Sequence, residues 1–212
     1  MEPFKSFKGL VSTLDRANID TDQIIPKQFL KSIKRTGYGE NLFFDWRYLP
    51  DGKSNPQFTL NEPRFKNASI LVVRNNFGCG SSREHAVWAI QQYGFRAVIA
   101  PYSERNGARI PAFADIFKNN CVKNSLLTIE LSEPEVEEIF KMVERYEGLR
   151  ATVNLDEECV TLNLPEEISF HFEIDSAVKE HLVHGLDDIG MILQHEEAIR
   201  KFESHHDTQI SR

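Results

Sequence analysis

Residues 68–92 read ASILVVRNNFGCGSSREHAVWAIQQ, and this stretch decides the fold. The apolar run at residues 68–73 is typical of a buried strand, and residues 84–92 are compatible with a helix. Between them, Gly78 and Gly80 allow a sharp backbone turn and leave its N–H groups uncovered by side chains. The pattern therefore predicts a strand, a glycine turn and a helix, as in α/β proteins.

The polar residues after the glycines indicate an anion site. Ser81, Ser82 and Arg83 stand where the helix begins, and free N–H groups and the helix dipole favour a negative charge there. The dipole disfavours a cation in a first turn, so an arginine in this position points to an anion that it meets. We expect the turn to hold a carboxylate and to stabilise the anion of a nearby hydroxyl group.

Two other interpretations of the turn stay open. Ser81 and Glu84 have the spacing of a capping box, which would stabilise the helix without any part in chemistry. Cys79 lies near a helix N-terminus, where a thiol can have a lowered pKa and act as a nucleophile with His85 as its base. A small cysteine packed in a tight turn is the simpler account of Cys79.

The turn does not match a nucleotide-binding loop. Arg83 occupies the place of the third glycine of a dinucleotide-binding motif, and no acidic residue ends the next apolar run at residues 97–100. The Gly-Lys-Ser/Thr sequence that ends a phosphate-binding P-loop is absent from the turn as well.

Composition limits the classes of function. A chain of 212 residues with 41% hydrophobic and 27% charged residues suits one soluble globular domain. We expect that domain to span residues 1–203, followed by a disordered tail at 204–212. The formal charge of −7 argues against a nucleic-acid partner. No apolar run approaches the length of a membrane span and no signal peptide is apparent, so we expect a cytoplasmic protein without a membrane partner.

The cysteines predict no metal site in this chain. Cys79, Cys121 and Cys159 are spaced about forty residues apart, without a zinc or iron–sulfur motif. An odd number of cysteines suits a reducing compartment. Any metal that the chemistry needs is therefore expected on another chain.

The rest of the sequence alternates between strand and helix patterns. Strands are expected at residues 9–14, 97–100, 126–131, 151–155, 159–164 and 168–174. Helices are expected at residues 113–120, 134–146, 175–185 and 187–202. Ser132 and Asp175 are the expected caps of two of these helices, and residues 18–26 form a turn with clustered carboxylates.

Motifs along nearly the whole chain resemble one known family. They are DTDQIIP at residues 20–26, NFGCGSSREHA at 76–86, FADIF at 113–117 and GLDDIG at 185–190. In this order they resemble the small subunits of bacterial 3-isopropylmalate dehydratases, within the aconitase superfamily. The resemblance implies an α/β fold, a swivelling β/β/α domain with mixed sheets and flanking helices, that closes over a catalytic large subunit.

The resemblance also implies an activity and its partners. The chain would form a heterodimer with the large subunit and isomerise 2-isopropylmalate and 3-isopropylmalate through 2-isopropylmaleate, in leucine biosynthesis. The large subunit would carry a [4Fe–4S] cluster whose iron acts as Lewis acid on the leaving hydroxyl, and this chain would bind no cofactor. Related dicarboxylates of the homoaconitate or citraconate type, and a non-catalytic carboxylate-binding module of the same fold, are the alternatives.

Three residues of the turn receive roles from the family. Ser81 matches the serine whose alkoxide removes a proton from the substrate carbon and returns one on rehydration. Arg83 matches the residue that pairs with a substrate carboxylate, and Ser82 would add a hydrogen bond. These roles agree with an anion site at the start of a helix.

Roles outside the turn follow from the family more loosely. Asp22 matches an acidic residue at the edge of the active site, and a turn or helix-capping aspartate is its alternative. Arg35 and Lys31, with Lys34, follow the Phe29-Leu30 pair and are candidates for contact with the substrate. An exposed basic loop is their alternative interpretation.

One segment departs from the family pattern. Residues 102–112 add about ten residues between the Ala100-Pro101 pair and the FADIF motif. The segment is polar and turn-prone, so we expect a mobile loop beside the site. Arg105 and Arg109 are its candidates for contact with the partner or the substrate, and an inert surface loop is the alternative.

Overall fold

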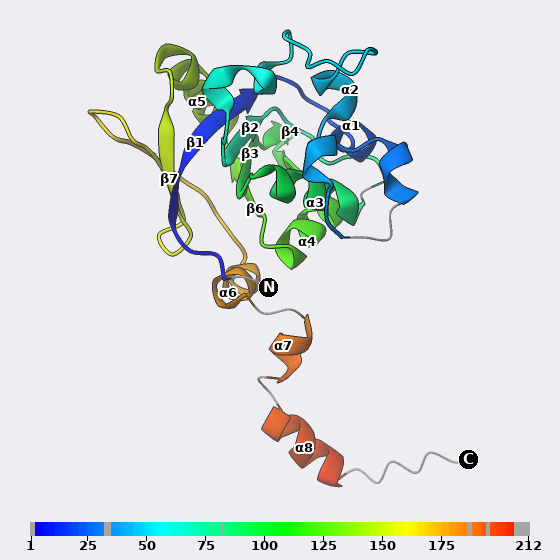
Figure 1. Ribbon diagram of the computed structural model, residues 1–212. Helices are drawn as coiled ribbons and strands as arrows, with labels where there is room; N and C mark the ends of the chain where they lie inside the picture. Colours follow the sequence, from blue (N-terminus) through cyan, green and yellow to red (C-terminus); the bar gives the residue numbers. More distant parts are fainter. Residues whose placement is uncertain (1–2, 32–34, 82, 186–187, 194–195, 206–212) are drawn as a thin grey trace.

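The computed structural model describes residues 3–31, 35–81, 83–185, 188–193 and 196–205. Seven strands within these residues form one mixed sheet in the order β6-β3-β2-β1-β7-β8-β9 (Figure 1). The parallel strands are β1 (Phe7–Leu14), β2 (Ile70–Val73), β3 (Ala97–Pro101) and β6 (Leu127–Leu131). The antiparallel strands are β7 (Arg150–Asn154), β8 (Cys159–Leu162) and β9 (Ile168–His171).

Strand β1 joins the two halves of the sheet. Its residues 7–10 pair antiparallel with β7, and its residues 11–14 pair parallel with β2. Every residue of β2 is buried, as expected for a parallel strand that is covered on both faces. The carboxyl ends of β1, β2 and β3 therefore lie at one edge of the sheet, where the glycine turn follows β2.

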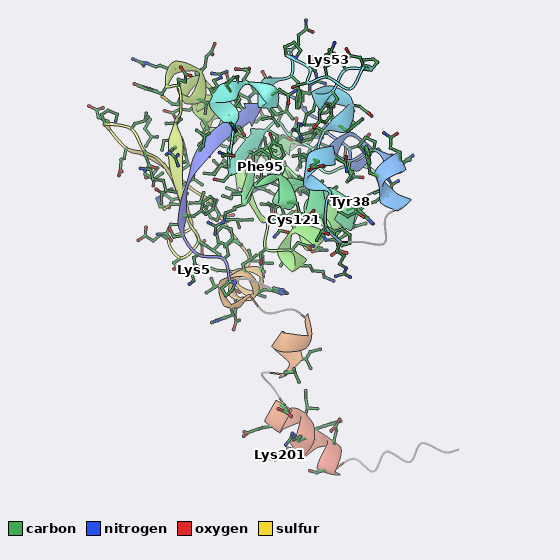
Figure 2. The ribbon with its side chains drawn as sticks, in the orientation of Figure 1. Lys5, Tyr38, Lys53, Phe95, Cys121 and Lys201 are labelled. Carbon is green, nitrogen blue, oxygen red and sulfur yellow. The ribbon has the colours of Figure 1, made fainter. Side chains whose placement is uncertain are left out.

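Helices cover both faces of the parallel strands. On one face, α1 (Thr21–Ile24), α3 (Glu84–Tyr93) and α4 (Asp115–Lys123) enclose a core that contains Leu71. Phe95 and Cys121, both labelled in Figure 2, lie in this core. On the other face, α5 (Glu133–Arg145) and the antiparallel strands enclose a second core around Ile70. Neighbouring residues of β2 thus enter different cores, as the pleat of a strand requires.

The connection from α1 to β2 is long and carries part of the first core. It contains α2 (Phe44–Arg47) and the short 3-10 helices η1 (Lys27–Lys31), η2 (Gly39–Asn41), η3 (Thr59–Asn61) and η4 (Pro63–Phe65). Phe43 and Phe58 are buried there, with ring centroids 6.1 Å apart. This packing explains why a segment with little regular structure is rich in aromatic residues.

The C-terminal part of the chain ends in three helices, α6 (Ser176–His184), α7 (Asp188–Leu193) and α8 (Glu196–His205). The backbone N–H of Phe4 donates to Leu182 O at 2.8 Å, which ties α6 to the residues before β1. Beyond α6, α7 and α8 extend away from the body (Figure 1). None of the described helices is long and apolar enough to cross a membrane.

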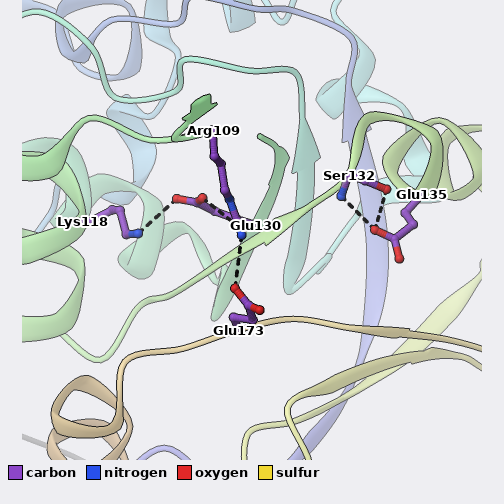
Figure 3. Close-up of polar contacts among 6 residues, drawn as sticks. All are labelled: Arg109, Lys118, Glu130, Ser132, Glu135 and Glu173. Carbon is purple, nitrogen blue, oxygen red and sulfur yellow. Dashed lines mark hydrogen bonds and ion pairs between the residues drawn. The ribbon is translucent and has the colours of Figure 1, made fainter. Parts of the chain in front are cut away.

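Most expected elements are present, and three expectations differ. The predicted caps Ser132 and Asp175 are confirmed as the N-cap residues of α5 and α6. The backbone N–H and the hydroxyl of Ser132 both donate to Glu135 Oε2 (Figure 3), and Asp175 Oδ1 accepts from Ala177 N and Val178 N. The single helix expected at 187–202 is divided into α7 and α8, and residues 194–195 lie outside the described residues. The expected tail is helical at residues 204–205 and otherwise lies outside the described residues.

The third difference is the extra segment at residues 102–112, where the expectation of a loop is wrong. Strands β4 (Ser103–Arg105) and β5 (Ala108–Ile110) pair antiparallel as a hairpin. Asn106 and Gly107 form its tip with φ angles of 52° and 75°. An Asn-Gly pair with positive φ at both residues is the preferred two-residue hairpin turn, so the local sequence does specify this element.

Candidate functional site

The glycine turn lies beside the residue 20–26 motif, although the two are about sixty residues apart in the sequence. Gly78 N donates to Ile19 O at 2.8 Å, and Thr21 N donates to Cys79 O at 3.1 Å. The Thr21 hydroxyl donates to Ser81 O at 3.2 Å. These contacts between buried or half-buried groups hold the backbone of Ser81 against the start of α1.

The residue 113–117 motif lies on the other side of the turn. Phe77 N donates to Ala112 O at 2.9 Å, and Ala114 N donates to Phe77 O at 3.3 Å. A Cβ atom on Gly78 would lie 2.3 Å from the ring of the fully buried Phe117, and Gly78 has a φ of +74°. Only glycine satisfies both the close approach and the backbone angle. The three motifs therefore meet at one edge of the sheet.

Ser81 does not cap the helix. Helix α3 begins at Glu84, its N-cap is Arg83, and no side chain caps it. The capping-box interpretation of Ser81 and Glu84 is wrong, because Glu84 instead accepts a hydrogen bond from Asn124 Nδ2 at 3.1 Å. Ser81 is exposed, and no described residue hydrogen-bonds to its hydroxyl group. The hydroxyl is free to meet a ligand.

Arg83 meets a carboxylate within the chain. Its Nη1 lies 2.5 Å from Asp22 Oδ1, and Lys27 Nζ lies 3.1 Å from Asp22 Oδ2. The Arg83 side chain is only 25% exposed, whereas Lys27 is 71% exposed. Two cations thus share the Asp22 carboxylate at the start of α3.

The neighbouring aspartate, Asp20, has the structural role that was an alternative for Asp22. Asp20 is the N-cap of α1, and its Oδ1 accepts from Gln23 N at 2.8 Å. The Gln23 side chain accepts from Asp20 N at 3.0 Å, which completes a capping box. Asp22 is therefore not the cap, and its carboxylate is available to Arg83.

The Cys79 thiol is a poor candidate for a nucleophile. Burial raises its pKa, and the negative charge of Asp20 raises it further. The thiol therefore stays protonated at neutral pH, and the expectation of a lowered pKa is wrong. His85 packs against two aromatic rings, with its centroid 4.7 Å from that of Trp88 and 5.4 Å from that of Tyr38.

Comparison with known proteins identifies the fold. Residues 1–134 match the family model described as Aconitase C-terminal domain. The chain belongs to this family. It is 53% identical over 208 residues to a 3-isopropylmalate dehydratase small subunit of Desulforapulum autotrophicum, covering 98% of this chain and 97% of that protein.

A solved structure gives the same architecture. The crystal structure of a 3-isopropylmalate dehydratase from Methanocaldococcus jannaschii matches with a TM-score of 0.62 and 23% identity, covering 92% of this chain and 98% of that chain. At this identity the likeness shows the fold alone. The expected α/β fold class, with a mixed sheet and flanking helices, is confirmed.

In this member of the aconitase C-terminal domain family, the structure describes only some of the other candidate residues. The guanidinium carbon of Arg35 lies 5.4 Å from the Trp88 ring centroid, on the first turns of α3. Arg35 is exposed, and its backbone carbonyl accepts from Gln92 Nε2 at 2.8 Å near the C-terminal end of α3, so it lies outside the Arg83 cluster. Ser82 lies outside the described residues, as does the side chain of Lys31, whose backbone ends η1.

Sequence reasoning missed Lys27 and Thr21. Both lie in or beside the residue 20–26 motif, but nothing in the local sequence distinguishes them from an ordinary surface lysine and an ordinary turn threonine. Their contacts join segments far apart in the sequence, so no local pattern reveals them. Among the described residues there is no group of three or more His, Cys, Asp or Glu side chains that could hold a metal ion.

Proposed function

We propose that the chain is the small subunit of a 3-isopropylmalate dehydratase that works in the cytoplasm as a heterodimer with its large subunit. Residues 1–203 form the swivelling domain, and the enzyme interconverts 2-isopropylmalate and 3-isopropylmalate in leucine biosynthesis. The observation that carries the proposal is the exposed Ser81 hydroxyl two residues before Arg83, in a cluster where Arg83 and Lys27 share the Asp22 carboxylate. The identity of 53% to a small subunit of this enzyme supports it.

Arg83 binds a carboxylate of the substrate. A guanidinium has five N–H donors in a fixed fork, and one of its ends is engaged by Asp22. The remaining N–H groups donate two hydrogen bonds to a substrate carboxylate, which fixes both the position and the orientation of the substrate. Asp22 thus holds the fork in one orientation at the edge of the site, and Ser82 adds a hydrogen bond.

Ser81 moves the proton. Its oxygen, as an alkoxide, takes the proton from the substrate carbon and becomes a hydroxyl group. The hydroxyl group of the substrate leaves the adjacent carbon with a proton from an acid that the large subunit would supply, which yields 2-isopropylmaleate and water. Return of the proton and the hydroxyl to the opposite carbons gives the isomer. Backbone N–H groups at the start of α3 stabilise the alkoxide, since the first N–H groups of a helix have no partner within the helix.

The large subunit provides the part of the chemistry that this chain does not. We assign to it a [4Fe–4S] cluster, which supplies Lewis-acid assistance to the loss and return of the hydroxyl group. The basic residues Arg35 and Lys31 lie on the segment after α1, and we propose that they contact the part of the substrate that differs among malate-type acids.

Reconstitution tests the proposal. The chain is purified alone, then mixed with the cluster-loaded large subunit, and the absorbance of 2-isopropylmaleate is followed from either isomer. We expect the chain alone to be colourless and inactive and the mixture to isomerise. Parallel assays with homoaconitate and citraconate identify the preferred acid. Turnover by the chain alone, or a mixture that is active only on another acid, contradicts the proposal.

A further inference from the structure

Asn124, the C-cap residue of α4, holds one face of α3. Its Nδ2 donates to Glu84 Oε1 at 3.1 Å and to Asn120 O at 2.8 Å. Its Oδ1 accepts from Trp88 Nε1 at 3.0 Å, and its backbone carbonyl accepts from Gln91 Nε2. Residues 84, 88 and 91 lie on successive turns of one helix face, so a single residue of α4 contacts α3 along most of its length.

The backbone at Asn124 is fixed by the way in which α4 ends. Ser125 N donates to Val122 O at 3.2 Å, and Leu126 N donates to Cys121 O at 3.0 Å. Ser125 has a φ of 55°, and these features together make a Schellman motif, which is a common end of a helix. A change of the Asn124 side chain therefore removes contacts with α3 and keeps the backbone hydrogen bonds that end α4.

Helix α4 supports both sides of the candidate site. Phe117, seven residues before Asn124, packs on Gly78 in the glycine turn. Asn124 then bonds to the first residue of α3, a helix whose N-cap Arg83 provides no side-chain cap. Helices α3 and α4 lie on the same face of the sheet (Figure 1), and Ser81 and Arg83 lie between the two places where α4 makes contact.

The contact with Asn124 directs the Glu84 carboxylate toward α4. Glu84 stands in the first turn of α3, where N–H groups without a partner in the helix and the positive end of the dipole attract carboxylates. It also follows Arg83 directly in the sequence. A Glu84 carboxylate that turned back would therefore occupy the anion site, and its charge would disfavour a second negative charge there.

We infer that Asn124 is a positioning residue for the anion site. It keeps the Glu84 carboxylate bound to α4, so that Arg83 and the first N–H groups of α3 stay available to a substrate carboxylate and to the Ser81 alkoxide. The inference rests on the proposed function, because Ser81 and Arg83 are the groups that it serves. Asn124 acts through Glu84 rather than by touching the substrate, so the effect of its loss should depend on the charge at position 84.

A double-mutant cycle on the complex with the large subunit tests the inference. Asn124→Ala releases the Glu84 carboxylate, and we expect kcat/KM for 2-isopropylmalate to fall by about tenfold. Glu84→Gln keeps an acceptor for Asn124, so its kcat/KM should stay within about twofold of the wild-type value. The double variant Asn124→Ala/Glu84→Gln has no carboxylate to release, and its kcat/KM should recover to within about threefold.

Asn163→Ala is the matched control. Asn163 follows β8 and shares two side-chain hydrogen bonds with Thr152 on β7, at 3.2 and 3.3 Å, in the antiparallel half of the sheet. Its replacement should lower the free energy of unfolding, as Asn124→Ala should, and leave kcat/KM unchanged. A purely structural role of Asn124 predicts a different result, in which the double variant is no more active than Asn124→Ala.

A second measurement separates this inference from the proposed function. In NMR spectra of the isolated chain, the backbone amide signals of residues 84 and 85 should shift in Asn124→Ala, because a carboxylate then reaches them, and return in the double variant. If the wild-type complex does not turn over isopropylmalate, the proposed function is wrong, and these signals still test the position of Glu84.

Three results would overturn the inference itself. They are unchanged amide signals in Asn124→Ala, an active wild-type complex whose Asn124→Ala variant keeps its kcat/KM, and a double variant that does not recover. Circular dichroism and the free energy of unfolding establish that each variant is folded.

Discussion

The serine turn and the hairpin β4–β5 lie at the same edge of the sheet but are held in place in different ways. Backbone hydrogen bonds to residues 19–21 and 112–114 fix the turn, and Gly78 packs directly on a buried ring. The hairpin is fixed by one side chain, Arg109, which reaches carboxylates 21 and 64 residues away. The turn therefore tolerates little change in its backbone, whereas the hairpin is an addition with a single main anchor.

Removal of the Ser81 hydroxyl should have the largest effect on activity. Ser81→Ala deletes the proposed base, and we expect the turnover of the complex to fall by roughly 10²–10⁴-fold. The free energy of unfolding should not change, because Ser81 does not cap α3. Steady-state turnover with saturating large subunit, together with chemical denaturation of the isolated chain, measures both quantities.

Cys79→Ala is the control for this experiment. It changes the same turn by one atom and removes the thiol whose pKa burial raises. Below that raised pKa the thiol is protonated, so its loss should leave turnover nearly unchanged between pH 7 and 8. A Ser81→Ala complex that keeps its turnover rate would contradict the assignment of Ser81 as the base. A Cys79→Ala complex that loses its turnover rate would show that the thiol takes part in the reaction.

A change at Arg83 should have a smaller effect, directed at binding. Arg83→Lys keeps the charge but replaces the bidentate fork by a point charge. We expect KM for isopropylmalate to rise by roughly tenfold or more, with a lesser fall in kcat. Asp22→Asn, which weakens the hold on Arg83, should change KM in the same direction by less. An unchanged KM for both variants would mean that substrate binds elsewhere.

The sequence predicted the elements around the candidate site better than the contacts of its side chains. The strand, the glycine turn and the helix were visible because glycine and an apolar run impose strong local constraints. The start of α3 at Glu84 was predicted, but Ser81 and Glu84 also have the spacing of a capping box. Only the structure, with Arg83 as the N-cap and Glu84 in contact with Asn124, shows that this spacing is not used. Asp20 and Asp22 stand two residues apart, and the structure alone separates the cap from the partner of Arg83.

The hairpin β4–β5 shows a different limit of prediction from the sequence. Its polar composition predicted a loop without anchors, although the Asn106-Gly107 pair favours a tight hairpin turn. The anchor was invisible because ion pairs between Arg109 and carboxylates on β6 and after β9 depend on the completed sheet. Sequence patterns thus predict elements that neighbouring residues determine, whereas contacts between segments far apart in the sequence are known only from the structure.

The smallest expected effect, that of Arg109→Ala, distinguishes a hairpin that depends on the Arg109 ion pairs from one that is stable without them. Arg109→Ala removes the contacts to Glu130 and Glu173, and the Arg109 and Glu173 side chains are 40% and 91% exposed. Ion pairs this exposed contribute little, so the free energy of unfolding should fall by less than about 1 kcal/mol. The backbone amides of residues 103–110 should nevertheless exchange with deuterium several-fold faster, because local opening needs only the anchor to be released. Arg109→Lys, which keeps one ion pair, should be intermediate. Unchanged exchange in Arg109→Ala would mean that the hairpin is stable without its anchor. A loss of several kcal/mol would mean that Arg109 supports the sheet itself.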